Sequence, residues 1–342
     1  MFIRPFLFLI ALLLLGAPPL KARCVDWPSV MIQGEIERLP KGKTRFVIES
    51  FQDDTKVPGD DWLEEGIPYL LMQYLSTPED SIALPKRIAD KLPAKQRPKF
   101  YIGGQYQHLQ STLRVFIQLK NASGKLLAQF PVEAPFPHSK EFFINFRISS
   151  EKILNKVGIV DIREEKLREI QNVTDSVRAF ENMSRGRDLF YSFDPDKMES
   201  ALVWFQESKN QDVHYREAYL GMSDAYAFLG LDKKQRRKPF GNDIQKAEGV
   251  LMEMKHFVKG SGTEPLSFAT RVINANVHFI TALHAAEQKQ WGDARTHLKN
   301  VLNYTPEDSI TYFHLANIYA KLGNSNQAKA YKKKSKELNS CL

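Results

Sequence analysis

The side chains that could do chemistry are few and scattered along this chain. Acidic residues gather in one stretch: Asp53, Asp54, Asp60, Asp61, Glu64 and Glu65. Their carboxylate oxygens could hold a hard cation, but their spacing lacks the regular alternation of a calcium-binding loop. Helix capping and solvation explain such a stretch better. The sequence therefore predicts no metal site and no cofactor.

The eight histidines form no ligand or catalytic pattern. Four of them lie in a stretch with helical periodicity: His278, His284, His297 and His314. In such a stretch, packed or solvated histidine is the usual role. Gly103-Gly104 is more typical of a bulge or a close strand contact than of a phosphate loop. Since no nucleophile is placed with a base, we expect no enzymatic activity.

The elements that position these side chains change character along the chain. Residues 44–158 are rich in β-forming residues and predict a small α+β domain with one largely antiparallel sheet. Four strands are predicted, at 45–51, 100–106, 113–119 and 125–132, with hairpin turns at 108–111 and 121–124. A helix is expected from about Trp62 to Leu75. Another is expected over 150–156.

Residues 181–339 show a helical pattern that repeats. Ala282 and Ala316 keep the same interval of about 34 residues as Ala294 and Ala328. Small residues at such positions allow two helices to cross closely, while large residues fill the gaps between neighbouring hairpins. The pattern predicts four helix hairpins, and the basic run 233–238 is expected to form a longer loop inside the second one.

The repeat resembles a known family. Tyr312-x-x-Leu315-Ala316-x-x-Tyr319, followed by Gly323 and Ala328, is similar to the tetratricopeptide repeat. This resemblance implies an all-α helical solenoid, because one hairpin alone cannot bury its apolar face and copies must stack.

The first half is similar to the TolB amino-terminal-like module. The residues that carry this resemblance are Val47 to Phe51, Asp61 to Ile67 and Tyr101 to Tyr106. That module precedes tetratricopeptide repeats in many bacterial adenylate cyclases and transcription regulators. The resemblance implies an α+β amino-terminal domain followed by a tetratricopeptide-type solenoid. It also implies an exported sensing or assembly module without an attached output domain.

Residues 1–22 have the layout of a secretory signal peptide. Arg4 precedes an apolar run from Phe6 to Leu15, and Ala22 is a plausible cleavage residue. An uncleaved anchor is the alternative, but the run is about half of the roughly 20 residues that span a bilayer. We therefore expect an exported, periplasmic protein without a membrane span after cleavage.

The two cysteines are Cys24 and Cys341, and neither has the paired spacing of a zinc site. Cys24 could be the lipid-modified first residue of a lipoprotein, although Lys21-Ala22-Arg23 is a poor match to the small apolar residues that such processing prefers. In an oxidising compartment the two cysteines could form a disulfide or remain free thiols. The sequence leaves these alternatives open.

The net charge of +8 favours an acidic partner only weakly. The lysines at 332–334 lie on a predicted helix, where a solvated face is the usual explanation. No aromatic residues interleave with the basic runs, so nucleic-acid binding is not expected.

In tetratricopeptide proteins a stripe on the first helix of each repeat lines a concave groove. Here the partner-binding residues predicted from that stripe and its surroundings are Leu220, Asp224, Asn276, Phe279, Leu283, Phe313 and Asn317. The large apolar side chains favour a protein or peptide with an apolar anchor, whereas a charged tail would need Lys or Arg. The alternative is that these residues pack against a neighbouring segment.

Two hypotheses for function follow. The first is an exported protein–protein interaction adaptor or scaffold that binds its partner in the groove of the solenoid. The second is an envelope sensing or assembly protein whose working site lies in the α+β domain.

Overall fold

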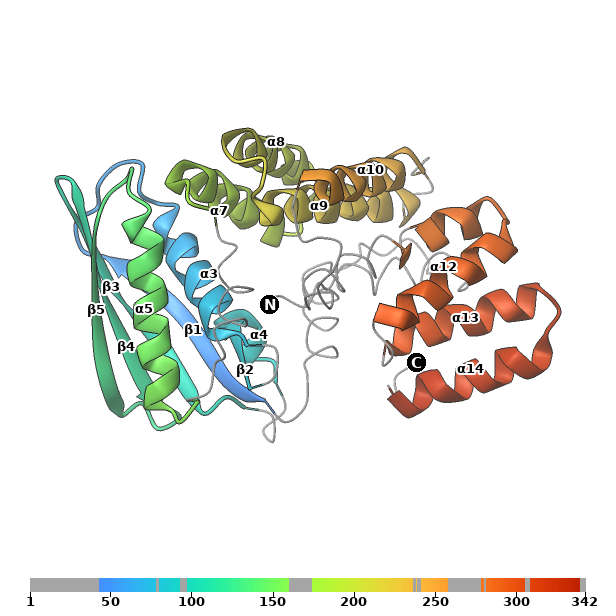
Figure 1. The fold of residues 1–342 in the computed structure, drawn as a ribbon, viewed down its shortest axis with the longest axis horizontal. Coiled ribbons are helices and arrows are strands. Elements are labelled where there is room, and N and C mark those ends of the chain that lie inside the picture. Colours follow the sequence, from blue (N-terminus) through green and yellow to red (C-terminus); the bar gives the residue numbers. More distant parts are fainter. Residues whose placement is uncertain are drawn as a thin grey trace. The chain divides into compact units, whose positions relative to one another are not determined.

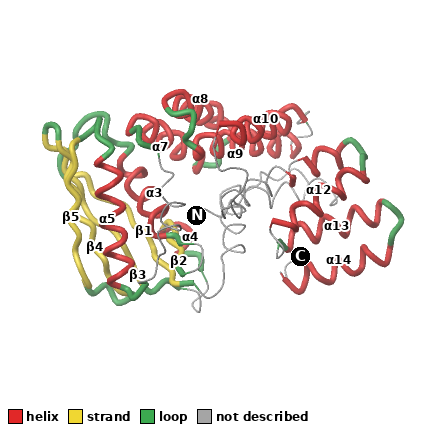
Figure 2. Tube along the Cα trace, in the orientation of Figure 1, coloured by secondary structure: helices red, strands yellow, loops and turns green. Residues whose placement is uncertain are grey.

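The computed structural model describes most of the chain between Lys43 and Leu338 (Figures 1 and 2). The described ranges are 43–77, 80–92, 97–159, 174–235, 238, 241–257, 278–279, 281–304 and 308–338. The predicted signal peptide, both cysteines and Asn276 lie outside these ranges. An α/β part with a five-stranded sheet comes first, and a helical region follows it.

The chain divides into two compact units, and each unit is made of more than one segment of the sequence. The first unit extends to Ser192 and also includes Glu199–Gly221. The second unit includes Phe193–Met198 and the chain from Met222 onward. Helix α7 (Val177–Tyr191) and the beginning of helix α9 (Arg216–Gln235) therefore group with the sheet. The domain boundaries expected from the sequence, 44–158 and 181–339, stay predictions.

The sheet is built from five strands in the order β2-β1-β3-β4-β5. Their bounds are β1 Thr44–Asp53, β2 Ser81–Pro85, β3 Phe100–Leu109, β4 Thr112–Asn121 and β5 Leu126–Pro135. β1 pairs in parallel with both β2 and β3, whereas β3–β4 and β4–β5 are antiparallel. The expectation of a largely antiparallel sheet is therefore wrong. Helix α3 (Leu63–Leu75) lies in the connection that returns the chain from β1 to β2, as parallel strands require.

Both predicted hairpins are confirmed. β3 turns into β4 through Gln110, whose φ of 57° is left-handed. β4 turns into β5 where the Asn121 side chain accepts hydrogen bonds from the backbone N–H groups of Ser123 and Lys125, at 3.1 and 2.9 Å. Gly124 in this turn has a φ of 80°, which glycine adopts without a steric penalty.

Two long helices pack on the sheet, and the short helix α4 (Lys86–Ala89) also contacts β1 and β2. α3 contacts β1 and β2, α5 (Glu141–Lys156) contacts β5, and the two helices touch each other (Figure 1). The buried residues of β4 alternate with half-buried ones along the strand: Leu113, Val115, Ile117 and Leu119 are all buried. α5 begins well before the helix expected at 150–156. Its first turns bury Phe142 and Phe146, aromatic residues that are also typical of strands.

The described part of the helical region consists of a series of helices (Figure 2). Their bounds are α7 Val177–Tyr191, α8 Pro195–Gln211, α9 Arg216–Gln235, α10 Gly241–Phe257, α12 Trp291–Tyr304, α13 Ser309–Lys321 and α14 Ser325–Leu338. Residues 278–279 and 281–287 are also helical. α13 is capped by Asp308, whose carboxylate accepts from the N–H groups of Ile310 and Thr311. The turn predicted at Gly323 is present, with a φ of 76°.

One loop expectation is wrong in part. The basic run was expected to form a loop, but Lys233 to Gln235 belong to α9. Lys233 Nζ donates to both carboxylate oxygens of Asp243 at 2.8 Å, and the Asp243 side chain is only 5% exposed. The buried carboxylate thus gives the basic side chain a partner, so the helix extends beyond Gly230.

Candidate functional site

The predicted partner-binding stripe is only partly accessible. Phe279 is 1% exposed and Leu283 is 2% exposed, so both are occupied in packing. Phe313 and Asn317 on α13 are half-buried. The burial of the first two residues favours the alternative stated for them above, namely packing against a neighbouring segment. Partner binding on α13 would depend on Phe313 and Asn317.

The stripe positions on α9 are also half-buried, and Asn276 lies outside the described residues. Leu220 belongs to the first compact unit and Asp224 to the second. Because both side chains are half-buried, each keeps some accessible surface.

His314 lies on α13 next to Phe313, and its side chain is buried. Its ring makes edge contacts with Phe279 and Phe313, at centroid distances of 5.5 and 5.7 Å. Burial in this aromatic setting lowers the pKa of His314 to about 3. Its Nε2 atom has no hydrogen-bond partner within the described part of the chain. The imidazole is therefore neutral at physiological pH, and it acts as a packing residue rather than as a cationic anchor.

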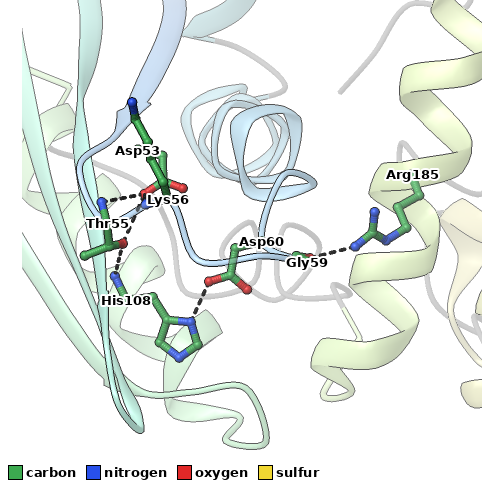
Figure 3. A network of polar contacts seen from close by, with 7 residues as sticks. All are labelled: Asp53, Thr55, Lys56, Gly59, Asp60, His108 and Arg185. Carbon is green, nitrogen blue, oxygen red and sulfur yellow. Dashed lines mark hydrogen bonds and ion pairs between the residues drawn. The ribbon is translucent and has the colours of Figure 1, made fainter.

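Figure 3 shows a network of polar contacts that includes residues of the acidic stretch between β1 and α3. Asp53 accepts from the backbone N–H groups of Thr55 and Lys56 at 2.8 and 2.9 Å, which closes the turn after β1. Burial raises the pKa of Asp53, but these backbone hydrogen bonds outweigh it and hold the pKa below its ordinary value. Asp53 thus closes a turn and caps no helix, and the N-cap residue of α3, Trp62, makes no side-chain cap hydrogen bond, so the helix capping expected for this stretch is absent there.

Asp60 has a role that the sequence did not indicate. Its Oδ2 lies 2.5 Å from Nδ1 of His108 on β3, and both side chains are nearly buried, at 11% and 13% exposed. The backbone N–H of His108 donates to the hydroxyl of Thr55 at 3.0 Å (Figure 3). The ring edge of His108 also packs against Phe136. These contacts attach the β1–α3 loop to the sheet.

Arg185 of α7 holds the same loop. Its guanidinium donates to the carbonyl oxygen of Gly59 at 2.7 Å (Figure 3). The same group donates to the carboxylate of Asp61 at 3.0 Å. It also pairs with Glu181 one helical turn away, at 3.1 Å. The acidic residues therefore serve three separate contacts instead of converging on one cation. Among the described residues, no group of three or more His, Cys, Asp or Glu side chains could hold a metal ion.

The Asp60–His108 pair resembles part of a catalytic dyad in composition only. Nε2 of His108 is buried and has no hydrogen-bond partner in the described ranges. A general base must reach the proton that it removes, and this nitrogen is closed off from solvent. The geometry is that of a structural lock on a loop.

A second polar cluster, also missed from the sequence, joins α3, α7 and α9 within the first unit. The Arg187 guanidinium lies 3.6 Å from the centre of the Tyr69 ring. The Tyr69 hydroxyl donates to Glu217 at 2.9 Å, and Arg216 donates to the other oxygen of that carboxylate at 2.8 Å. Burial, followed by the Glu217 charge, raises the pKa of Tyr69 well above its ordinary value. The tyrosine therefore stays protonated and keeps its donor.

Neither cluster had a local signal in the sequence. His108 and Asp60 are separated by 48 positions, Arg185 and Asp61 by 124, and Tyr69 and Glu217 by 148. Only the pairing of distant segments brings these residues together.

No helix in the described ranges is both long and apolar enough to cross a bilayer. Comparison with protein-family models finds no match for the chain, and comparison with curated proteins finds none either. The resemblance to the tetratricopeptide repeat and to the TolB amino-terminal-like module thus stays a prediction that rests on the quoted residues.

Proposed function

We propose that this chain is an exported adaptor whose helical region binds a protein or peptide partner. The observation that carries the proposal is the burial of small residues at three of the four repeating positions; the fourth, Ala328, is half-buried. Ala282, Ala294 and Ala316 are 1%, 0% and 4% exposed. Small buried residues at helix crossings are what stacked hairpins require, and stacked hairpins generate extended binding surfaces.

The partner surface that we propose is centred on α13. Phe313 is a large apolar side chain that is half-buried, and Asn317 lies one turn further along the same helix. A partly exposed aromatic residue with an amide beside it fits a partner that supplies one apolar anchor and a backbone hydrogen bond. Phe279 supports this surface, because its ring contacts the ring of His314 on α13.

The test is site-specific photocrosslinking in the full chain, expressed in its native cell. A crosslinker at Asn317 should capture one discrete partner, and Phe313→Ala should abolish that capture while the helical circular dichroism is unchanged. Truncating a buried aromatic anchor at an interface typically costs about 2 kcal/mol or more. The control position is Lys333 on α14, whose side chain is 81% exposed.

Capture that is equal from positions 317 and 333, or that survives Phe313→Ala, contradicts the proposal. A crosslinker at Lys56, in the loop of Figure 3, distinguishes the second hypothesis. If the discrete partner is captured from position 56 and not from 317, the working site lies in the α/β part instead.

A further inference from the structure

One face of the last described helix carries positive charge alone. α14 contains five lysines against one glutamate. Four of these lysines follow the spacing i, i+3, i+4 and i+7, which places side chains on one face of a helix. They are Lys329, Lys332, Lys333 and Lys336, and all four are exposed. We call them the lysine face.

The other side of α14 is the packed side. Ser335 is buried, while Ala328, Tyr331 and Leu338 are half-buried. α14 packs against α13, and the ring of Tyr331 stacks on the ring of Tyr319 of α13 at a centroid distance of 5.3 Å. This packing fixes the rotation of the helix about its axis, so the lysine face points away from α13 into solvent.

Few carboxylates are available to neutralise the lysine face. The neighbouring helix α13 contains no acidic residue. On α14 itself, Glu337 lies 4.0 Å from Lys333 and 3.9 Å from Lys334. Both ion pairs are long and exposed, so each contributes little. The lysine face therefore keeps most of its positive charge.

This arrangement works against the helix that carries it. Like charges three or four positions apart destabilise a helix, and the lysine face contains four such pairs. A surface that serves solubility alone can intersperse charges of both signs. A face of one sign instead raises the local concentration of an oppositely charged partner. The partner that fits this face is therefore an anion with many charges.

The residue types favour a lipid surface over an acidic protein. All four cations are lysines, whereas protein interfaces are enriched in arginine and depleted in lysine. The planar guanidinium of arginine recognises single carboxylates through two hydrogen bonds, while the lysine ammonium acts as a point charge. Point charges suit the diffuse negative potential of anionic head groups. Single-stranded nucleic acid would also need aromatic side chains for base stacking, and the lysine face has none.

We propose that the lysine face of α14 docks this chain on a membrane surface that contains anionic phospholipid. The contact is peripheral, because the face holds no large apolar side chain to insert among the lipid chains. Each lysine near such a surface strengthens binding about fivefold. Salt screens the interaction, because the Debye length falls from about 10 Å at about 0.1 M salt to about 3 Å at about 1 M.

The experiment is flotation of the full chain with vesicles of two compositions. One contains equal parts of phosphatidylcholine and phosphatidylglycerol, and the other contains phosphatidylcholine alone. The wild-type chain should float with the anionic vesicles at about 0.1 M salt and lose this binding at about 1 M. Replacing all four lysines of the face by glutamine should weaken binding by more than about 100-fold.

Two controls separate the lysine face from other causes of binding. The neutral vesicles report any binding through the apolar run Phe6–Leu15, because that run carries no charge. A matched variant replaces four exposed lysines of the α/β part by glutamine and removes the same net charge. It should bind the anionic vesicles as the wild type does. The replaced residues are Lys125, Lys140, Lys152 and Lys156.

The proposal is overturned if the wild-type chain does not float with the anionic vesicles, or if the matched variant loses binding as fully as the α14 variant. It is also overturned if poly-glutamate binds the chain more tightly than the vesicles do at equal negative charge, since the face would then fit an acidic protein. Far-ultraviolet circular dichroism verifies that both variants are folded. Lys332→Gln and Lys333→Gln, each expected to weaken binding about fivefold, replace a fourfold variant that does not fold.

Discussion

His314 shows how a single buried residue links the packing of the helical region to pH. Its pKa in the folded chain is about 3, whereas an exposed histidine has a pKa near 6.5. Below that ordinary pKa the unfolded chain binds a proton that the folded chain does not bind. The free energy of unfolding therefore decreases as the pH falls from about 6.5 towards 3.

The expected decrease is about 1.4 kcal/mol per pH unit, which gives a loss of about 2 kcal/mol at pH 5. His314→Leu should remove this part of the acid sensitivity, because the replacement is apolar and does not titrate. Urea unfolding at pH 7 and at pH 5, for the wild type and the variant, measures the difference. His214→Gln, at an exposed position, is the control. An equal loss in His314→Leu and in the wild type contradicts this assignment.

Asp60 and Asp61 are adjacent carboxylates in different environments. The Asp60 side chain is 11% exposed and pairs with His108, while the Asp61 side chain is 74% exposed and pairs with Arg185. Asp60→Asn should cost about 1.5–3 kcal/mol, since it removes a charged partner from a buried hydrogen bond. Asp61→Asn should cost less than about 1 kcal/mol, because solvent screens that pair. Equal destabilisation of the two variants in denaturant unfolding would refute the buried lock.

At the scale of elements, close helix packing depends on two glycines that contact Phe205. A Cβ atom added at Gly186 on α7 would lie 2.6 Å from the Phe205 ring, and one added at Gly221 on α9 would lie 2.8 Å away. Phe205 itself is 1% exposed. The ring of Phe205, on α8, therefore contacts both α7 and α9. These two helices can lie so close to the ring only because Gly186 and Gly221 carry no side chain.

Gly186→Ala should consequently destabilise the first unit by about 1–3 kcal/mol through overpacking. This result would reverse the usual rule, by which alanine gains up to about 1 kcal/mol over glycine inside a helix. Gly249→Ala on α10 is the matched control, because nothing lies within 4 Å of its added Cβ. It should follow the usual rule. Calorimetric melting of both variants makes the comparison, and a stabilising Gly186→Ala would exclude the proposed contact.

Ala316 tests the repeating pattern on α13. It is 4% exposed, whereas Ala320 one turn later is exposed. Ala316→Leu should cost about 1–3 kcal/mol by overpacking, and Ala320→Leu should change the stability by less than about 0.5 kcal/mol. Thermal unfolding compares the two. An Ala316→Leu variant as stable as the wild type would show that the small residue is not required at this crossing.

At the scale of the whole molecule, the boundary between the sheet and the helical region is not a point in the sequence. Phe180 on α7 is fully buried, and its ring stacks on Tyr69 of α3 at a centroid distance of 6.1 Å. The chain up to Ser192 and the segment Glu199–Gly221 belong to the same compact unit as the sheet. The first helices of the helical region therefore have two roles, because they complete the core of the α/β part and also begin the series of helices.

The sequence by itself determined the features that depend on neighbouring residues. The β3–β4 and β4–β5 hairpins follow from turn residues between β-forming runs, and α13 and the turn at Gly323 follow from helical spacing and a left-handed glycine. Each of these is a local preference, encoded within a few residues. The repeating alanines were found in the same way, because their interval is visible along the chain.

Only the tertiary structure decided which distant segments meet. The parallel pairing of β1, the Asp60–His108 lock and the burial of Phe279 all depend on where remote elements pack. An apolar side chain on a helix suits a core and a binding groove equally well, so periodicity could not distinguish the two at Phe279. The sequence around a carboxylate is likewise the same whether the group caps a turn in solvent or pairs with a buried imidazole. The partner of Asp60 comes from a distant strand, so the neighbouring residues do not reveal it. The strength of the interaction depends on burial, which is also set by the tertiary structure.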